Sequence, residues 1–290
     1  MYSNKVWYIT GASQGLGLSL VKQLLSAGYR VSATSRSVSE MQNKIGAKDS
    51  RCFLPQEVDL TKSDAIYESI ERTIATFGTI DVIVNNAGYG MEGTVEELNE
   101  RAMRDIFEIN VFAAIHVTKH ALPHLRRQRS GHIINISSVA GFVGAPGWSV
   151  YSATKAALIA FSEVLALDLK ELGIKVTVIG PSGFRTGFLS EKSLVTTESQ
   201  ISDYQAVSKT RSRYAAMDGN QDGDPEKAAK LFIQIAENPE PPLHLWLGAN
   251  AIERASEKIA FMGQELNTWK ELSVSADFHH DSEKTSNMKM

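Results

Sequence analysis

The sequence predicts an α/β fold with a doubly wound, seven-stranded, mainly parallel sheet and helices on both faces. Short β-rich runs alternate with segments of helical periodicity, which is the pattern of parallel βαβ units. A glycine-rich turn joins the first run to the first helical segment, and no repeat or linker marks a second domain. We therefore expect one domain over residues 1–274, followed by a polar tail over 275–290.

The strands are expected, in chain order, at residues 5–10, 30–35, 52–58, 81–86, 132–137, 174–180 and 243–247. Helical periodicity lies between them, as in the spacing of Leu16, Leu20 and Leu24. Residues 187–224 interrupt this alternation, because they are rich in Ser, Thr and Gly and lack a strong apolar stripe. An excursion of this length in a compact fold is typical of a lid, so we predict a substrate lid here.

Composition excludes several classes of protein. The chain has 30 Lys and Arg against 33 Asp and Glu, a net charge of -3, which favours neither nucleic acid nor a membrane as a partner. A single cysteine, Cys52, excludes an internal disulfide and is compatible with a reducing compartment. No signal peptide and no apolar run of roughly 20 residues is evident, so we expect a soluble cytoplasmic protein.

The turn "TGASQGLG" (10–17) leads from the first strand directly into a helix. Its glycines, Gly11, Gly15 and Gly17, permit a tight turn at a helix N-terminus, where backbone N–H groups can hold a pyrophosphate. The loop is completed by Ser13, Gln14 and Leu16. Its spacing, GxxxGxG, differs from the common GxGxxG fingerprint, and a purely structural turn is the alternative. In this βαβ context the turn favours a Rossmann-type dinucleotide site.

The second strand ends at Ser35 and Arg36, where a dinucleotide-binding unit reads the adenosine ribose. A carboxylate there would repel a 2′-phosphate, whereas a guanidinium can pair with it. NADP(H) is therefore favoured over NAD(H), with an ordinary surface arginine as the alternative.

Two further strand ends supply candidate cofactor contacts. Asp59, followed by Leu60, could accept the adenine amino group or could be a solvated turn residue. In "NNAG" (85–88), Asn86 can hold the backbone of neighbouring strands, while Ala87 and Gly88 let the chain pass close to a ribose. Ligands of open α/β sheets bind at such carboxyl ends.

The stretch "YSATK" (151–155) places a phenol and an amine four residues apart, on one face of a helix. We expect the Lys155 cation to lower the pKa of Tyr151, which would then exchange a proton with a substrate oxygen. Ser138, at the end of the fifth strand, would hydrogen-bond that oxygen, and Lys155 would also hold the nicotinamide ribose. Taken alone, such a Tyr/Lys pair is more often structural, and only its combination with the other motifs favours catalysis.

Together, "TGASQGLG", "NNAG", Asn110, Ser138 and "YSATK" resemble the short-chain dehydrogenase/reductase family, over residues 5 to about 250. The resemblance implies that Asn110 kinks its helix and holds a water that links Lys155 to solvent. It also implies that residues 180–188 contact the nicotinamide carboxamide, with Thr186 as the side-chain partner. The backbone contributors in that segment are Pro181, Gly183 and Phe184.

One departure from the family pattern is Ser182, which stands where Pro181 is usually followed by glycine. This difference leaves the local backbone path open. Members of the family commonly associate through the helices that carry Asn110 and Tyr151, so the resemblance implies a homodimer or homotetramer.

His116, His120 and His124 recur every four residues, a spacing that suggests a metal site on a helix. We expect none, because Pro123 should interrupt that turn and no carboxylate or thiol ligand lies among them.

Aromatic residues near the expected nicotinamide position suggest an apolar substrate pocket, formed by Tyr89, Phe142, Trp148 and Phe188. The sequence thus indicates an NADP(H)-dependent oxidoreductase that interconverts a lipophilic ketone or aldehyde and its alcohol. The alternative is a non-catalytic NADP(H)-binding redox sensor.

Overall fold

A computed structural model describes residues 5–46, 51–197 and 200–278. Its main sheet has the order β3-β2-β1-β4-β6-β7-β9, and every neighbouring pair is parallel. The strands are β1 (Val6–Ile9), β2 (Arg30–Ser35), β3 (Phe53–Glu57), β4 (Val82–Asn85), β6 (Gly131–Ile136), β7 (Ile174–Pro181) and β9 (His244–Leu247). The doubly wound, seven-stranded sheet expected from the sequence is confirmed.

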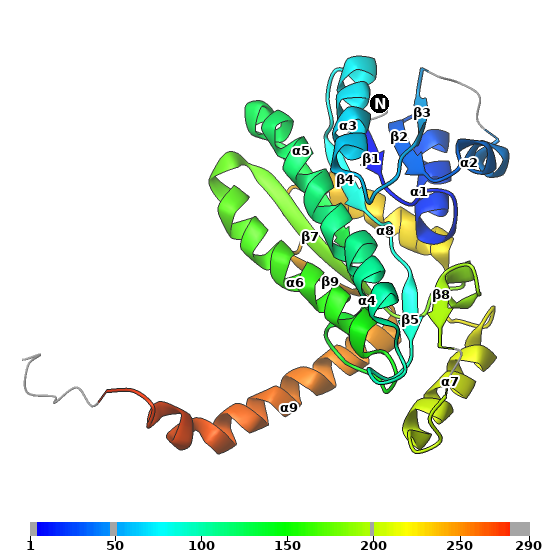
Figure 1. Cartoon of the computed structure of the whole chain (residues 1–290). Coiled ribbons are helices and arrows are strands. Elements are labelled where there is room, and N and C mark those ends of the chain that lie inside the picture. Colours follow the sequence, from blue (N-terminus) through cyan, green and yellow to red (C-terminus); the bar gives the residue numbers. More distant parts are fainter. Residues whose placement is uncertain (1–4, 47–50, 198–199, 279–290) are drawn as a thin grey trace, which may run out of the picture.

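Helices cover both faces of this sheet (Figure 1). One face carries α1 (Gly15–Ser26), α2 (Val38–Ile45) and α8 (Pro225–Glu237); the other carries α3 (Ser63–Phe77), α5 (Ala113–Gln128) and α6 (Ser149–Leu169). Side chains alternate across a strand, so Trp7 and Ile9 join the first core while Tyr8 joins the second. The connections between these helices and strands include α4 (Glu100–Phe107), a π-helical turn (Glu108–Phe112) and short 3₁₀ turns at Val139–Gly141 and Lys170–Leu172.

The strand order reverses between β1 and β4, which lie side by side. Ligands of open parallel sheets bind at the carboxyl ends of such a pair. Asn86, just after β4, ties these ends together: its Nδ2 donates to the carbonyl oxygens of Thr10 and Gly11 at 2.9 and 3.0 Å. The strand ends predicted to hold a dinucleotide are therefore tied together at the switch point.

The segment 187–224 contains more regular structure than the sequence indicates. It forms a 3₁₀ turn (Gly187–Leu189), strand β8 (Leu194–Thr196) and helix α7 (Gln205–Met217), and β8 pairs in parallel with β5 (Gly90–Glu92). A three-residue strand is too short for a period-2 signal, and α7 buries only Val207 and Thr210. The apolar stripe of α7 is thus too sparse to be read from the sequence.

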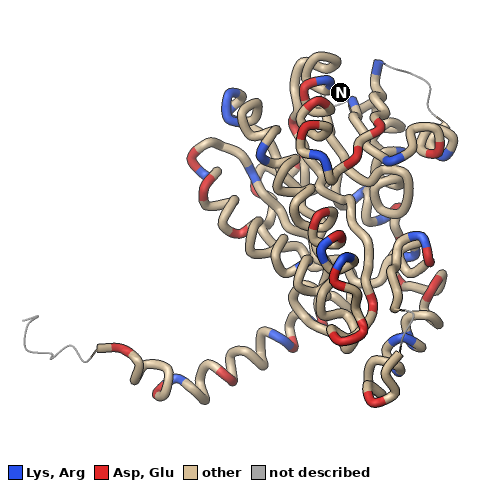
Figure 2. The backbone as a smooth tube through the Cα atoms, in the orientation of Figure 1, with Lys and Arg blue, Asp and Glu red and all other residues tan. Residues whose placement is uncertain are grey.

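After β9 the chain forms α9 (Ala249–Val274), which projects from the body (Figure 1). The expected polar tail begins where α9 ends, and its residues 279–290 lie outside the described residues. Acidic and basic residues are interspersed over the molecule (Figure 2), as the small net charge suggests.

One stretch among the described residues, Ser149–Leu172, is long and apolar enough to cross a membrane by length and composition. The sequence analysis did not anticipate such a stretch. It comprises α6 and the short turn after it, and α6 packs on β7 and buries Lys155 and Leu158. We therefore interpret it as the central helix of the fold.

Candidate active site

Tyr151 and Lys155 lie one turn apart at the start of α6, and both are almost completely buried, with exposures of 5% and 4%. The Lys155 Nζ lies 5.9 Å from the centre of the Tyr151 ring and donates to the carbonyl oxygen of Ile136 at 2.9 Å. An ammonium has three donors, and this hydrogen bond occupies one of them. The helix spacing therefore brings the pair together as the sequence predicts.

The pKa of the Tyr151 phenol is shifted in the direction opposite to the expectation. Burial raises the pKa of Tyr151 above its ordinary value of 10.0, and the hydrogen bond with Ser138 offsets only part of this effect. The sequence analysis expected Lys155 to lower this pKa, but desolvation dominates and burial also lowers the pKa of Lys155 to about 8. Without a cofactor, Tyr151 is therefore a protonated phenol at neutral pH.

Ser138 caps the 3₁₀ turn that follows β6. Its Oγ accepts from the backbone N–H of Ala140 at 3.1 Å, which leaves the hydroxyl proton available to a second acceptor. Because Ser138 also hydrogen-bonds Tyr151, both hydroxyls are close enough to share one substrate oxygen.

Asn110 lies in the π-helical turn between α4 and α5, which matches the kink implied by the family resemblance. Its Oδ1 accepts from the backbone N–H of Tyr89, and its Nδ2 donates to the Tyr89 carbonyl, both at 3.0 Å. Nδ2 also donates to Thr154 Oγ1 on α6 at 3.1 Å. A Cβ on Gly88 would lie 3.1 Å from Asn110 Oδ1 and 3.2 Å from Lys155 Nζ. Asn110, Gly88 and Lys155 therefore meet beside Tyr151.

The glycine-rich turn has the geometry of an anion cradle. Gly11 and Gly15 have φ values of 66° and 56°, and a Cβ on Gly17 would lie 2.5 Å from Asn86 Nδ2. Gln14, at the N-cap of α1, makes no side-chain cap and instead donates to Ser193 Oγ at 2.8 Å. The first-turn N–H groups of α1 are thus not capped by a side chain, and this cradle fits a pyrophosphate.

The adenosine end contains the predicted residues and one cation that the sequence analysis missed. Ser35 is buried at the end of β2, and Arg36 beside it is exposed. Lys44, on α2, donates to the Ser13 carbonyl oxygen at 3.1 Å. No sequence signal singles out Lys44, because only the packing of α2 brings it to the glycine turn.

Asp59 Oδ1 accepts from the backbone N–H and the hydroxyl of Thr61 at 2.9 and 2.8 Å, and these bonds lower the pKa of Asp59. Leu60 packs partly buried against the second core. Oδ1 of Asp59 therefore stabilises the turn, which is the alternative role considered for this residue. Oδ2 remains a candidate acceptor for the adenine amino group.

The segment after β7 lies against the glycine turn. A Cβ on Gly15 would lie 3.4 Å from Thr186 Cβ, and Thr186 Oγ1 accepts from the backbone N–H of Phe188 at 3.3 Å. Pro181 ends β7, and Ser182 binds the Leu247 carbonyl oxygen through both its N–H and its hydroxyl, at 2.9 and 3.3 Å. The unusual Ser182 therefore ties this segment to β9.

The ring of Phe184 packs against Gly223, where a Cβ would lie 2.5 Å from it, and Gly183 faces Gln221. Residues 181–186, predicted to contact the nicotinamide, therefore lie between the glycine-rich turn and residues 221–223.

Comparison with protein families supplies the deciding observation: the short chain dehydrogenase model matches residues 5–195, more than half of the chain. The chain belongs to the short-chain dehydrogenase family. Three curated relatives are an oxidoreductase, BOA17, from Botryotinia fuckeliana (34% identity, 94% of this chain and 99% of the relative), a 3-ketodihydrosphingosine reductase from Bacteroides thetaiotaomicron (34%, 83% and 86%) and retinol dehydrogenase 8 from Bos taurus (30%, 81% and 78%).

Solved structures of this family share the fold. A short-chain dehydrogenase from Streptomyces avermitilis superposes with a TM-score of 0.87 at 34% identity, covering 95% of this chain and all of that one. Two more distant structures show the fold alone: ElxO with NADP bound (TM-score 0.71, 23% identity, 87% of this chain and 100% of that one) and a Burkholderia phymatum enzyme in complex with NAD (0.76, 21%, 90% and 96%).

Aromatic rings cover Tyr151 in this family member. The rings of Trp148 and Phe188 lie 5.3 and 5.7 Å from that of Tyr151, and Tyr89 packs against the same apolar cluster. Phe142 does not join them, because its ring packs 5.0 Å from Trp246 of β9. Its assignment to the substrate pocket is therefore not supported by the structure.

Tyr214, which the sequence analysis missed, lies 5.0 Å from Trp148 and comes from α7 of the lid. The apolar cluster therefore includes a residue of α7, within the segment predicted as a lid, as well as residues beside the sheet.

A largely buried ionic cluster joins α7 to the segment that contains β5. Arg211 Nε on α7 lies 3.5 Å from Glu92 Oε1 on β5, and Arg211 Nη2 lies 3.9 Å from Glu97 Oε2. Burial raises the pKa of Glu92, and the Arg211 charge opposes this effect. The sequence does not reveal these partners of Arg211, which lie more than 100 positions earlier in the chain. This cluster ties α7 to β5 and to the segment that follows it.

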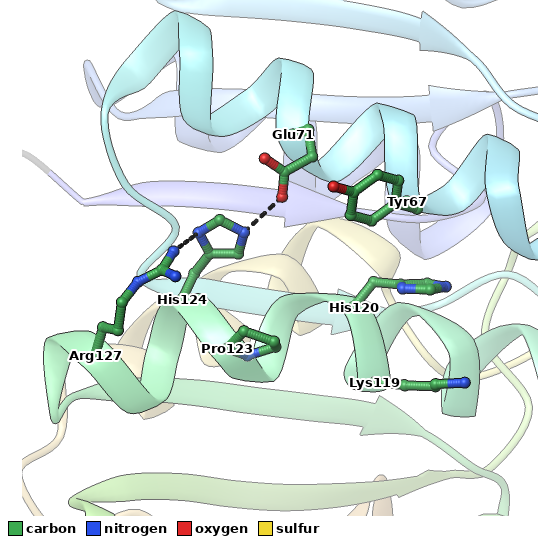
Figure 3. A pocket seen from close by; sticks show the side chains of 7 residues that line it. All are labelled: Tyr67, Glu71, Lys119, His120, Pro123, His124 and Arg127. Carbon is green, nitrogen blue, oxygen red and sulfur yellow. Dashed lines mark hydrogen bonds and ion pairs between the residues drawn. The ribbon is translucent and has the colours of Figure 1, made fainter.

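The histidine triplet lies elsewhere in the dehydrogenase, beside a surface pocket of about 470 Å³ between α3 and α5 (Figure 3). The expected interruption at Pro123 is wrong, because α5 continues through it. His120 Nε2 hydrogen-bonds Ser63 Oγ at 2.8 Å. His124 Nε2 faces Glu71 Oε1 at 2.7 Å, and its Nδ1 accepts from Arg127 at 2.8 Å. Among the described residues no group of three or more His, Cys, Asp or Glu side chains could hold a metal ion.

Proposed function

We propose that the protein is an NADP(H)-dependent oxidoreductase that interconverts a lipophilic ketone or aldehyde and the corresponding alcohol. The observation that carries this proposal is the burial of the Tyr151 hydroxyl beside Ser138 and Lys155, under an apolar cluster and next to an anion cradle. A proton donor, an oxygen-binding hydroxyl and a dinucleotide cradle together favour hydride transfer to a carbonyl.

A nicotinamide cofactor held by the glycine-rich turn would supply the hydride. Tyr151 donates its phenolic proton to the carbonyl oxygen, and the Ser138 hydroxyl donates a hydrogen bond to the same oxygen as negative charge develops on it. Lys155 donates one hydrogen bond to Ile136, so its other N–H groups can bind the ribose hydroxyls. The positive charge of Lys155 stabilises the phenolate that forms on Tyr151. Asn110 holds the backbone of Tyr89 against α6, which fixes this arrangement.

The apolar cluster supports a lipophilic substrate, and the retinol dehydrogenase and 3-ketodihydrosphingosine reductase among the relatives are named for lipid substrates. A panel of long-chain and aromatic carbonyls, with NADPH oxidation as the readout, tests the proposal. Turnover that increases with apolar chain length would support it. NADPH binding without turnover on any carbonyl or alcohol would contradict it and favour a redox sensor.

The preference for NADP(H) rests on Arg36, since the fold neighbours were solved with NADP in one case and NAD in another. We expect Arg36→Asp to weaken NADPH binding by about 10- to 100-fold, the value of a charge-assisted hydrogen bond, while NADH binding is unchanged or improved. Fluorescence titration with each cofactor measures this. Arg104→Asp, on the exposed surface of α4, is the control; an unchanged cofactor ratio in Arg36→Asp would remove Arg36 from the proposal.

We expect the rate of carbonyl reduction to depend on Lys155. Its pKa is lowered to about 8, so the ammonium is present below pH 8 and is lost as the pH rises through that value. The raised pKa of Tyr151 keeps the phenol protonated over the same range. Accordingly, kcat/KM for reduction should be flat below about pH 8 and should fall above it. A profile that rises between pH 7 and 9 would contradict this assignment.

We further propose that the protein is cytoplasmic and assembles through α5 and α6. Phe112, at the start of α5, and Val164 and Leu167 on α6 are large apolar residues left exposed on these helices. Such a patch supports the homodimer or homotetramer implied by the family resemblance.

A further inference from the structure

Three successive residues at the end of β6 contact the Tyr151–Lys155 pair. The carbonyl oxygen of Ile136 accepts from Lys155 Nζ at 2.9 Å, and Ser138 hydrogen-bonds the Tyr151 phenol. Between these two contacts, the Ser137 hydroxyl donates to the backbone carbonyl oxygen of Lys155 at 2.7 Å. Lys155 is therefore bonded to the end of β6 through both its ammonium and its main chain.

The central sheet fixes the position of Ser137. This residue is only 2% exposed, and its backbone N–H donates to the Ile179 carbonyl oxygen on β7 at 2.8 Å. The strand that it follows, β6, pairs in parallel with both β4 and β7. Close packing on all sides leaves such a strand end little room to shift, so the Ser137 hydroxyl is a donor at a fixed point.

The Lys155 peptide also packs against the turn that follows Ser138. A Cβ on Gly141 would lie 2.6 Å from the Lys155 carbonyl carbon and 2.8 Å from the carbonyl oxygen. Inside an α-helix this oxygen accepts from the N–H group four residues further on, and its second lone pair is free for another donor. The Ser137 hydroxyl supplies that second hydrogen bond.

The lysine side chain depends on fixed attachment points because its four-carbon stem is flexible. In the proposed reaction Lys155 Nζ serves two groups at once, the cofactor ribose and Tyr151, whose ring centre lies 5.9 Å away. The bonds to Ile136 and Ser137 hold the stem at its two ends. A displacement of about 1 Å at a catalytic group can lower a rate by on the order of 10²-fold, so these bonds bear directly on the reaction.

We propose that Ser137 is a positioning residue, whose hydroxyl holds the main chain of Lys155 against β6 and so aligns the ammonium with Tyr151 and the cofactor ribose. This proposal rests on the proposed function, which assigns both of those roles to Lys155. Ser137 acts through Lys155, whereas Ser138 acts on the substrate oxygen. The two adjacent serines therefore have different tasks.

Ser162, about two turns further along α6, provides a matched control. It is completely buried, its hydroxyl donates to the Leu158 carbonyl oxygen at 2.6 Å, and it accepts from Asn135 Nδ2 at 2.8 Å. Ser162 thus ties α6 to β6 as Ser137 does, but away from Lys155. The substitution Ser162→Ala removes the same chemical group from the same interface and leaves the contacts of Lys155 in place.

The substitution Ser137→Ala is expected to weaken NADPH binding and to lower kcat by about 2- to 10-fold each, the value of one hydrogen bond. KM for the carbonyl should not change, because the apolar cluster around Tyr151 keeps its packing. Ser162→Ala should lower the thermal midpoint of unfolding, as Ser137→Ala does, but should leave kcat and NADPH affinity at their wild-type values. Equal losses of NADPH affinity in the two variants would overturn the proposal.

A double-mutant cycle with Lys155→Met tests whether Ser137 acts through the ammonium. In the Lys155→Met background, Ser137→Ala should cause no further loss of NADPH affinity, because the group that Ser137 positions is absent. A purely structural contact would cost the same affinity in both backgrounds, and that result would overturn the proposal. Fluorescence titration with NADPH requires no turnover, so the cycle decides the role of Ser137 even if the protein reduces no carbonyl of the panel.

Discussion

Replacement of Tyr151 by phenylalanine is expected to lower kcat for carbonyl reduction by about 10²- to 10⁴-fold, the usual contribution of a positioned proton donor. The ring would remain packed against Trp148 and Phe188, so the substitution removes one oxygen and leaves the apolar cluster in place. NADPH affinity should therefore change by no more than about twofold. Steady-state kinetics on the best carbonyl of the panel and a cofactor titration measure the two quantities.

The control for this substitution is Tyr67→Phe, which removes a phenolic oxygen from the exposed face of α3. It should leave both kcat and NADPH affinity unchanged. If Tyr151→Phe retained more than about a tenth of wild-type kcat, the proton would have to come from another group, and the proposed function would lose its central residue.

The sequence was sufficient to predict the sheet and the position of the glycine-rich turn at the ends of β1 and β4, because both depend on local signals. β-rich runs such as Val82–Asn85 are fully buried strands. Glycines stand at positions 11 and 17 because a side chain would clash there, and at position 15 because its φ of 56° favours glycine. The i, i+4 spacing of Tyr151 and Lys155 is a property of any α-helix, so their proximity followed as soon as α6 was recognised.

Other features depend on tertiary packing and could not be predicted from the sequence. Phe142 is as aromatic as Phe188, but the path of the chain after β6 turns it toward Trp246. The partners of Arg211 lie more than a hundred positions away along the chain, on the segment that contains Glu92 and Glu97. The pKa of Tyr151 was predicted in the wrong direction, because burial, which a sequence does not display, raises it by more than the Ser138 hydrogen bond lowers it.

Lys155→Met is the second substitution with a large expected effect. The variant loses the cation that stabilises the phenolate and the donors proposed for the ribose, so kcat should fall by about 10²-fold or more and NADPH affinity by about 10- to 100-fold. Because Tyr151→Phe should leave cofactor affinity nearly intact, a joint loss in Lys155→Met and a single loss in Tyr151→Phe would separate the two roles. Unchanged NADPH affinity in Lys155→Met would contradict the proposed ribose contact.

Lys155→Met should also show how much burial of the Lys155 ammonium lowers the free energy of unfolding. The folded-state pKa of about 8 lies below the ordinary 10.5, so the charged amine destabilises the folded state fully below pH 8. Between pH 8 and 10.5 the unfolded chain binds more protons, and wild-type stability should rise relative to Lys155→Met by up to about 3 kcal/mol. Urea unfolding at pH 7 and pH 10 measures this difference, with Lys230→Met on the exposed surface of α8 as the control. An equal difference at both pH values would show that Lys155 is not held as a desolvated cation, and would remove the physical basis for its role beside Tyr151.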